Sequence, residues 1–379
     1  MKNISYALIG GGVMGLEHIR YVNKINNATI DMIIEPNKVQ RSMCQEHIPN
    51  VEFNSLESLN FKDDIDGVIV CTPNHTHFDI LRFLFKSNIK NILLEKPAVT
   101  KPSDVFKIKK MAQSWGGKIW VGMEYRYMAP ISELLKESQK GTIGIPYMMT
   151  VREHRNPFLK KVGNWNRFNK NSGGTLVEKC CHFFDLMHLF FQSNPKKVFA
   201  SGGQDVNHLD EHYDDGKPDI IDNAFVIVDF ENGKRAMLDL CMFAEGAKYQ
   251  EELSLTGDKG RMDARVPAMW AETSKDNPTH GELTINMRYT QKPETRTIKV
   301  QEDILKIGAH SGSTWFEHLG FVSMIKNDLE PDVSLEDGLR AVVMGMAAEK
   351  SVKTGKEVDL TGIFDNQGNL IQDVSDLTI

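Results

Sequence analysis

The feature that most constrains this chain is a glycine-rich turn close to its N-terminus. The sequence GGGVMG at residues 10–15 follows the apolar run Ile4–Ile9, and Val13–Ile25 then places apolar side chains at helical spacing. A strand that enters a helix through G-x-G-x-x-G presents backbone amides and the positive end of the helix dipole to a phosphate. The pattern therefore predicts a βαβ unit that binds a dinucleotide.

Each glycine of the motif has its own expected role. Gly10 allows the tight turn, Gly12 lets a pyrophosphate approach the backbone, and Gly15 lets the helix pack closely on the strand. Glu35 follows Gly15 by 20 residues at the end of the second predicted strand, where a carboxylate accepts hydrogen bonds from an adenosine ribose. Because a carboxylate repels the 2′-phosphate of NADP, the expected cofactor is NAD, although nearby basic residues keep NADP open. The alternative is a glycine turn with an incidental glutamate. The predicted cofactor contacts here are Gly10, Gly12, Val13, Met14, Gly15 and Glu35.

The order of apolar patterns predicts two kinds of sheet. Over the first 120 residues short apolar runs alternate with helical patterns, which indicates a parallel sheet. Beyond about residue 145 strand-like runs follow one another. Asn232-Gly233 between Ala224–Phe230 and Arg235–Phe243 is a hairpin signal, since both central residues of a type I′ turn need positive φ.

We therefore predict an α/β chain of two domains. Residues 1–123 form the dinucleotide-binding domain, and residues 124–379 form a second domain with a mostly antiparallel sheet and inserted helices. Apolar spacing predicts a closing helix over about residues 335–354.

The composition excludes several classes of protein. With 379 residues, 41% hydrophobic and 25% charged, the chain is of ordinary globular type. A net charge of −6 gives no general attraction to nucleic acid or anionic membranes, so neither is an expected partner. No apolar run approaches the ~20 residues of a spanning helix, and the N-terminus lacks the core of a signal peptide. Five cysteines, mostly scattered, favour reduced thiols and a cytoplasmic location.

A second chemical signal is Glu95-Lys96-Pro97, at the end of a predicted parallel strand. Open α/β sheets bind ligands at the carboxyl ends of their strands. A lysine there can donate a hydrogen bond to a substrate hydroxyl and stabilise negative charge on it. The alternative is a charged strand end that stops at a proline, and the residues alone leave both readings open.

The segment around His182 carries a third signal. At ~100° per residue, Glu178, His182 and Asp185 fall on one stripe of a helix, opposite an apolar stripe. A carboxylate can orient an imidazole that acts as a general base. Two structural alternatives compete: a capping box from Thr175 to Glu178, and a histidine tied to Asp185. A metal site that adds Cys181 is weaker, because no second ligand cluster has suitable spacing, and no metal is expected.

Several motifs together resemble one known family, and the resemblance covers essentially the whole chain. It is carried by IGGGVMG at residues 9–15, Cys71-Thr72-Pro73-Asn74-His75-Thr76-His77, Glu95-Lys96-Pro97, Tyr125-Arg126-Tyr127, Ser172-Gly173-Gly174 and Ser351-Val352-Lys353-Thr354-Gly355-Lys356. These motifs are similar to those of the glucose–fructose oxidoreductase, inositol dehydrogenase and MocA-like (Gfo/Idh/MocA) oxidoreductases. The resemblance implies an N-terminal Rossmann domain and a C-terminal α+β domain. The large, open, mostly antiparallel sheet of that second domain commonly forms homodimer or homotetramer interfaces.

The resemblance also implies roles for particular residues. Lys96 would lie beside the nicotinamide and touch the reacting hydroxyl, and its bond to Pro97 is often cis in relatives. The family's aspartate four residues before a histidine matches Glu178 and His182, with a side chain one methylene longer. The implied further cofactor contacts are Thr72, Pro73, Asn74, His77, Glu95 and Lys96. The candidate substrate contacts are Lys96, Arg126, His154, Trp165, His182 and Asp185.

The expected function is an NAD(P)-dependent dehydrogenase that acts on a secondary hydroxyl of a cyclitol, sugar or sugar derivative. Lys96, His182 and Glu178 are its expected catalytic residues. One alternative is a redox-neutral enzyme of the same fold that oxidises a sugar transiently and reduces the product again. Another is a dinucleotide or sugar sensor without catalysis, against which the presence of both Lys96 and His182 argues.

Overall fold

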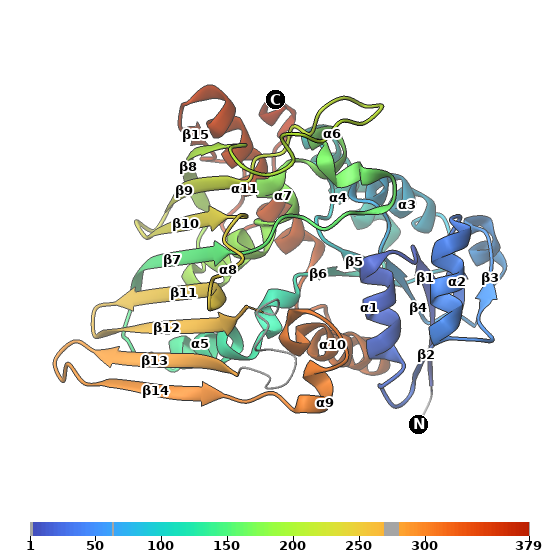
Figure 1. The fold of residues 1–379 in the computed structure, drawn as a ribbon, viewed down its shortest axis with the longest axis horizontal. Coiled ribbons are helices and arrows are strands. Elements are labelled where there is room, and N and C mark those ends of the chain that lie inside the picture. Colours follow the sequence, from blue (N-terminus) through green and yellow to red (C-terminus); the bar gives the residue numbers. More distant parts are fainter. Residues whose placement is uncertain (1–2, 63, 269–279, 379) are drawn as a thin grey trace.

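The computed structural model describes residues 3–62, 64–268 and 280–378, which form two sheets side by side (Figure 1). The first sheet has six strands in the order β3-β2-β1-β4-β5-β6, and every neighbouring pair is parallel. Its strands are β1 (Ile4–Ile9), β2 (Ala28–Ile34), β3 (Glu52–Phe53), β4 (Gly67–Val70), β5 (Asn91–Glu95) and β6 (Lys118–Gly122). The helices between them are α1 (Val13–Val22), α2 (Lys38–His47), α3 (His77–Leu84) and α4 (Pro102–Trp115). The parallel, doubly wound sheet predicted from the N-terminal pattern is confirmed.

The strand order fixes where a ligand can meet this sheet. The chain runs outward from β1 to β3 on one side and from β4 to β6 on the other, so the order reverses between β1 and β4. Ligands of open α/β sheets bind at such a switch point, outside the carboxyl ends of the strands. The glycine turn follows β1 at this edge, and residues 71–77 and 96–97 follow β4 and β5 there.

The second sheet has nine strands in the order β14-β13-β12-β11-β7-β10-β9-β8-β15. Among the described strands of this sheet only β7 and β10 pair in parallel, so the predicted mostly antiparallel character is confirmed. Its strands are β7 (Pro146–His154), β8 (Pro195–Gly203), β9 (Asn223–Phe230), β10 (Arg235–Cys241), β11 (Tyr249–Gly257), β12 (Gly260–Pro267), β13 (Gly281–Met287), β14 (Pro293–Ile298) and β15 (Val358–Asp359).

The predicted hairpin between β9 and β10 forms, but not with the expected type I′ turn. Among its loop residues only Gly233 has a positive φ, 80°, and Asn232 does not. Four residues separate the strands, and Gly233 N–H donates to the Phe230 carbonyl at 3.0 Å. A four-residue loop built around an ordinary turn needs one left-handed residue rather than two.

Helices of the later chain fill the space beside both sheets. They are α5 (Ala129–Gln139), α6 (Asn169–Ser172), α7 (Thr175–Glu178), α8 (Cys181–Phe191), α9 (Glu302–Leu305), α10 (Ser313–Asn327) and α11 (Leu335–Thr354). The predicted closing helix is α11, which begins with a capping box between Ser334 and Asp337 and ends at Gly355. Helix α10 packs on the first sheet, where Phe321 stacks on Tyr6 with ring centroids 5.6 Å apart. None of the helices in the described ranges is long and apolar enough to cross a membrane.

The glycine turn gives a test of how tightly β1 and β4 are joined. Gly10 has φ +97°, and a Cβ there would lie 2.6 Å from the Cys71 carbonyl oxygen. We expect Gly10→Ala to lower the free energy of unfolding by about 2–4 kcal/mol, from backbone strain and collision together. Gly116→Ala is the control, because φ is +71° there but nothing lies within 4 Å of the added Cβ. It should cost only about 1 kcal/mol. Thermal unfolding followed by circular dichroism measures both, and equal shifts in the two variants would contradict the expected collision.

Candidate active site

The glycine turn is open where a phosphate would approach. A Cβ at Gly15 would lie 2.1 Å from the Gly10 carbonyl oxygen, so helix and strand are in close contact there. A Cβ at Gly12 would meet nothing within 4 Å. Gly12 is also the N-cap of α1, and no side chain caps the amides of that helix. The turn therefore fits an anionic group at the helix N-terminus.

Glu35 reaches from the end of β2 to this turn. Its Oε2 accepts a hydrogen bond from the Gly11 amide at 2.6 Å, and its Oε1 accepts one from the Asn37 amide at 2.7 Å. The residue is 8% exposed. The carboxylate lies next to the glycine turn, where the sequence placed a ribose contact. Arg41, a basic residue near Glu35 in the sequence, donates from Nε to the backbone carbonyl of Glu35.

His77 ties two loops of the sheet edge together. Its Nδ1 lies 2.8 Å from the Pro97 carbonyl oxygen, and its Nε2 lies 3.0 Å from that of Thr72. Burial lowers the pKa of His77, and a neutral imidazole donates to only one of these carbonyls. Both ring nitrogens face backbone carbonyls inside the protein, so His77 holds these two loops together. Its contact with a cofactor stays a prediction. Asn74 fits the role of a cofactor contact, because its buried Nδ2 has no hydrogen-bond partner.

Glu95 forms a buried cluster with two histidines that the sequence analysis did not identify. Its Oε1 lies 2.9 Å from His18 Nε2, and His18 Nδ1 lies 2.8 Å from His318 Nε2. His18 comes from α1 and His318 from α10, 300 positions apart in the chain. No spacing in the sequence connects these residues, so only the packing of α10 on the first sheet reveals the cluster.

Lys96 crosses from the first sheet to the segment before α8. Its Nζ donates to the Glu178 carbonyl at 3.0 Å, and the Lys96–Pro97 bond is cis. Burial works against the charged form, but acidic groups around the ammonium, Cys181 first and then Glu124, outweigh it and raise the pKa of Lys96. Lys96 is therefore a cation at neutral pH, held within reach of the segment that carries His182.

His182 does not use Glu178 as its partner. The helix is interrupted at residues 179–180, and Glu178 Oε1 instead lies 3.3 Å from Lys161 Nζ. The carboxylate beside His182 is Glu124, whose Oε1 lies 3.6 Å from His182 Nε2. The expected pairing of Glu178 with His182 is therefore not observed. The ammonium of Lys161 draws the longer glutamate side chain away, and Glu124 takes its place.

The two structural alternatives for this segment are also resolved. Thr175 does not form a capping box, because its Oγ1 donates to the Ile221 carbonyl at 2.6 Å and the N-cap of α7 is Gly174. His182 is not tied to Asp185, which forms two hydrogen bonds with Arg126, at 2.6 and 2.5 Å. In the described part of the chain, no group of histidine, cysteine and acidic residues could hold a metal ion.

Its surroundings keep the His182 imidazole neutral. Burial first, and then the positive charge of Lys96, lower its pKa well below 6.5. Tyr125 stacks on the ring with centroids 4.1 Å apart, and Nδ1 is buried without a hydrogen-bond partner. Because His182 is only 1% exposed, a substrate would reach it only after neighbouring side chains move. A neutral imidazole with an unpartnered nitrogen is the form that accepts a proton.

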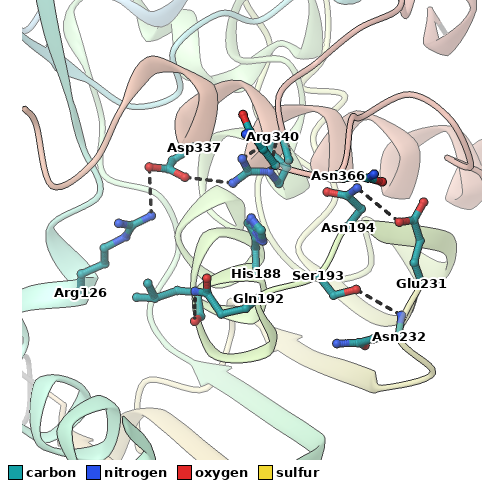
Figure 2. A pocket seen from close by; sticks show the side chains of 13 residues that line it. Arg126, His188, Gln192, Ser193, Asn194, Glu231, Asn232, Asp337, Arg340 and Asn366 are labelled. Atoms are coloured by element: carbon teal, nitrogen blue, oxygen red, sulfur yellow. Dashed lines mark hydrogen bonds and ion pairs between the residues drawn. The ribbon is translucent and has the colours of Figure 1, made fainter.

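Two of the expected substrate contacts, Arg126 and Asp185, bind each other. Arg126 is held by Asp185 and borders a separate cavity of about 660 Å³, where it approaches Asp337 to 3.7 Å (Figure 2). Neither Lys96 nor His182 lines that cavity. Arg126 and Asp185 are therefore paired with each other, and their contact with a substrate stays a prediction.

The remaining two expected contacts differ from each other. His154 lies in β7 next to Glu153 and pairs with Asp239 at 3.2 Å. Since side chains alternate along a strand, it faces the opposite side of the sheet from buried Glu153, which pairs with Lys179 at 2.9 Å. His154 is thus not brought to the site. Trp165 lies beside the lysine that pairs with Glu178. Lys161 Nζ is 4.5 Å from the centroid of the Trp165 ring.

Comparison with known proteins shows which family this chain resembles. The description "Oxidoreductase family, NAD-binding Rossmann fold" matches residues 4–123, and "Oxidoreductase family, C-terminal alpha/beta domain" matches residues 137–360. Myo-inositol 2-dehydrogenase of Thermotoga maritima is 25% identical over 360 residues, 94% of this chain and 98% of that protein. A 2,7-anhydro-N-acetylneuraminate hydratase of Mediterraneibacter gnavus is 26% identical over 243 residues, 63% of this chain and 62% of that protein.

The solved structures agree on the fold. An oxidoreductase of Agrobacterium radiobacter, crystallised with NAD+, L-tartaric acid and magnesium, has a TM-score of 0.77 at 15% identity. The match covers 94% of this chain and 98% of that one. The two family matches, the parallel sheet with its glycine turn and the second open sheet lead to one conclusion: this chain belongs to the Gfo/Idh/MocA family of oxidoreductases and carries its NAD-binding Rossmann fold.

Proposed function

We propose that this protein interconverts a secondary alcohol and a ketone on a cyclitol, sugar or sugar derivative, with NAD as cofactor. In this proposal residues 1–123 bind NAD and residues 124–379 supply the substrate side. One observation carries it: Lys96 from the first sheet donates to the Glu178 carbonyl, four residues before His182. A cation and a neutral imidazole from two parts of the chain are thus close enough to act on one small molecule.

The residues divide the chemistry between them. NAD, held by the glycine turn, Glu35 and Asn74, would accept or donate the hydride. His182 takes the proton of the reacting hydroxyl, since its lowered pKa leaves it neutral at pH 7. Lys96 donates a hydrogen bond to the same oxygen and stabilises negative charge that develops on it in a poorly solvated site. Glu178 contributes its carbonyl to Lys96 and its carboxylate to Lys161.

The names of relatives favour the polyol class. Inositol 2-dehydrogenases match nearly the whole chain, at 25% identity in Thermotoga maritima and 23% in Rhizobium meliloti. A hydratase named for 2,7-anhydro-N-acetylneuraminate is similar over a shorter stretch. It supports a second candidate, a redox-neutral conversion in which the protein retains its cofactor. Turnover of a sugar by purified protein without added NAD would favour that candidate.

We also propose that the protein is a homodimer or homotetramer through the second sheet. Phe199 pairs with Ile227 and Ile227 with Met237 across β8, β9 and β10, so three apolar side chains form a row. With Phe225 and Met148 they are 36% to 61% exposed on the outer face. An apolar patch of this kind on a sheet is suited to contact with a second copy of the chain.

Removing either reacting group tests the chemistry. We expect Lys96→Ala and His182→Ala each to lower kcat on the order of 10²-fold or more, because each removes one proton or charge interaction. The affinity for NAD should change little. Nicotinamide absorbance follows turnover on a panel of inositols, aldoses and sugar acids. His47→Ala, an exposed histidine at the end of α2, is the control and should leave kcat unchanged. Near-normal turnover in both variants would refute the mechanism.

Glu35 tests cofactor choice. Glu35→Gln removes the charge next to the glycine turn. We therefore expect the affinity for NAD to fall about tenfold, or ~1.4 kcal/mol, while the affinity for NADP falls less or rises. Dissociation constants from isothermal titration calorimetry report both cofactors. Glu52→Gln changes an exposed carboxylate that pairs with Lys62, and should affect neither. An unchanged ratio of NAD to NADP affinity in Glu35→Gln would exclude this role.

The outer face of the sheet tests assembly. Ile227→Lys places a charge in the middle of the apolar row and should convert the oligomer to monomers, measured by sedimentation velocity. Val39→Lys is the matched control, because Val39 is 66% exposed on α2, away from the sheet. A monomeric parent protein, or an oligomer that tolerates Ile227→Lys, would argue against this interface.

A further inference from the structure

The turn before α10 has a backbone that needs an explanation. His310, Ser311 and Gly312 have φ values of 62°, 54° and 79°, so three successive residues are left-handed and two of them are not glycine. Such conformations cost free energy and persist where the surrounding structure imposes them, often at functional sites. Here the turn directs the His310 imidazole toward two buried acidic side chains.

These contacts form a continuous row that starts at His182. Glu124 Oε1 lies 3.6 Å from His182 Nε2 and 3.9 Å from His310 Nε2, so one carboxylate oxygen faces both imidazoles. His310 Nδ1 lies 2.9 Å from Glu17 Oε1, which also accepts a hydrogen bond from Thr314 Oγ1 at 3.0 Å. A small side-chain rotation would bring the two longer contacts, of 3.6 and 3.9 Å, within hydrogen-bond distance.

Exposure changes along the row. The side chains of His182 and Glu124 are 1% and 2% exposed, whereas that of His310 is 23% exposed. A proton that reaches His182 therefore has no direct contact with bulk water. His310 is the member of the row that meets solvent.

We propose that Glu124 and His310 form a relay that carries a proton between His182 and solvent; this rests on the proposed function of His182 as the base. The substrate hydroxyl proton is taken up at His182 Nδ1, and the Nε2 proton of His182 passes to Glu124 Oε1. Glu124 passes that proton to Nε2 of neutral His310, whose Nδ1 proton stays hydrogen-bonded to Glu17 Oε1. The imidazolium then releases the Nε2 proton to water when its partly exposed ring turns away from Glu124. Return of the His310 ring and tautomer exchange at His182 restore the starting state, so one proton passes from the substrate to water and the protein keeps none.

The proton affinities of the three groups suit this direction. Burial raises the pKa of Glu124, and burial lowers that of His182, so the two approach each other. Burial also opposes protonation of His310, but the charge of Glu17 outweighs it and raises the pKa of that imidazole. These directions favour a proton on His310 over a proton on His182.

Turnover with a mobile proton carrier tests the relay. In the full-length protein with NAD, myo-inositol and dilute buffer, we expect His310→Gln to lower kcat for oxidation about tenfold or more. Added imidazole should restore most of that loss and leave the parent protein unchanged, which a purely structural role would not predict. Thr314→Val removes the other partner of Glu17 without removing a proton carrier, and should keep normal kcat. Normal kcat in His310→Gln, or a loss that imidazole does not relieve, would overturn the relay.

Two further measurements separate this idea from the proposed function. If His182→Gln is inactive while His310→Gln has normal kcat, the relay is refuted and the role of His182 as base stands. If His182→Gln has normal kcat, both the relay and the role of His182 as base are refuted. Nitrogen-15 spectra of histidine-labelled protein need no substrate. We expect His182 to be neutral with its proton on Nε2, and to change tautomer in Glu124→Gln. A His182 ring with its proton on Nδ1 in the parent protein would rule the relay out.

Discussion

The contact on which the rest of the site depends is the hydrogen bond from Lys96 Nζ to the Glu178 carbonyl. It joins the end of a parallel strand to a short helical segment of the C-terminal alpha/beta domain. A backbone carbonyl is a firm anchor, because its position is set by the fold and not by a rotamer. The ammonium is therefore held in place beside the segment of His182 before any ligand arrives.

Such a contact is possible only because the surrounding charges balance. Partly buried Lys96 and buried Lys179 lie among Glu95, Glu124 and Glu153. A charge in such a place is tolerated where opposite charges and hydrogen bonds surround it. The same burial that raises the pKa of Glu124 lowers that of His182. Dense packing of ionisable groups thus sets which of them is charged, and it leaves His182 neutral among cations.

Several parts of the site were predictable because they depend on short stretches of sequence. The glycine turn, the carboxylate of Glu35 beside it and the position of Lys96 at the end of β5 all follow from a strand–turn–helix pattern. The partners of His182 and His77 were not predictable. Glu124 replaces Glu178 because the helix breaks at residues 179–180, and a break of two residues moves a side chain off its expected stripe.

The sequence by itself determined the two kinds of sheet, the nucleotide turn and the residue types that can move a proton or hold a phosphate. These are local properties, set by the periodicity of apolar side chains and by glycine at close backbone contacts. Only the tertiary structure decided which charges meet. Two of the contacts join segments about 300 residues apart, His18 with His318 and His310 with Glu17. Arg126 forms hydrogen bonds with Asp185. Electrostatic partners depend on distance in space, and no periodicity along the chain encodes that distance.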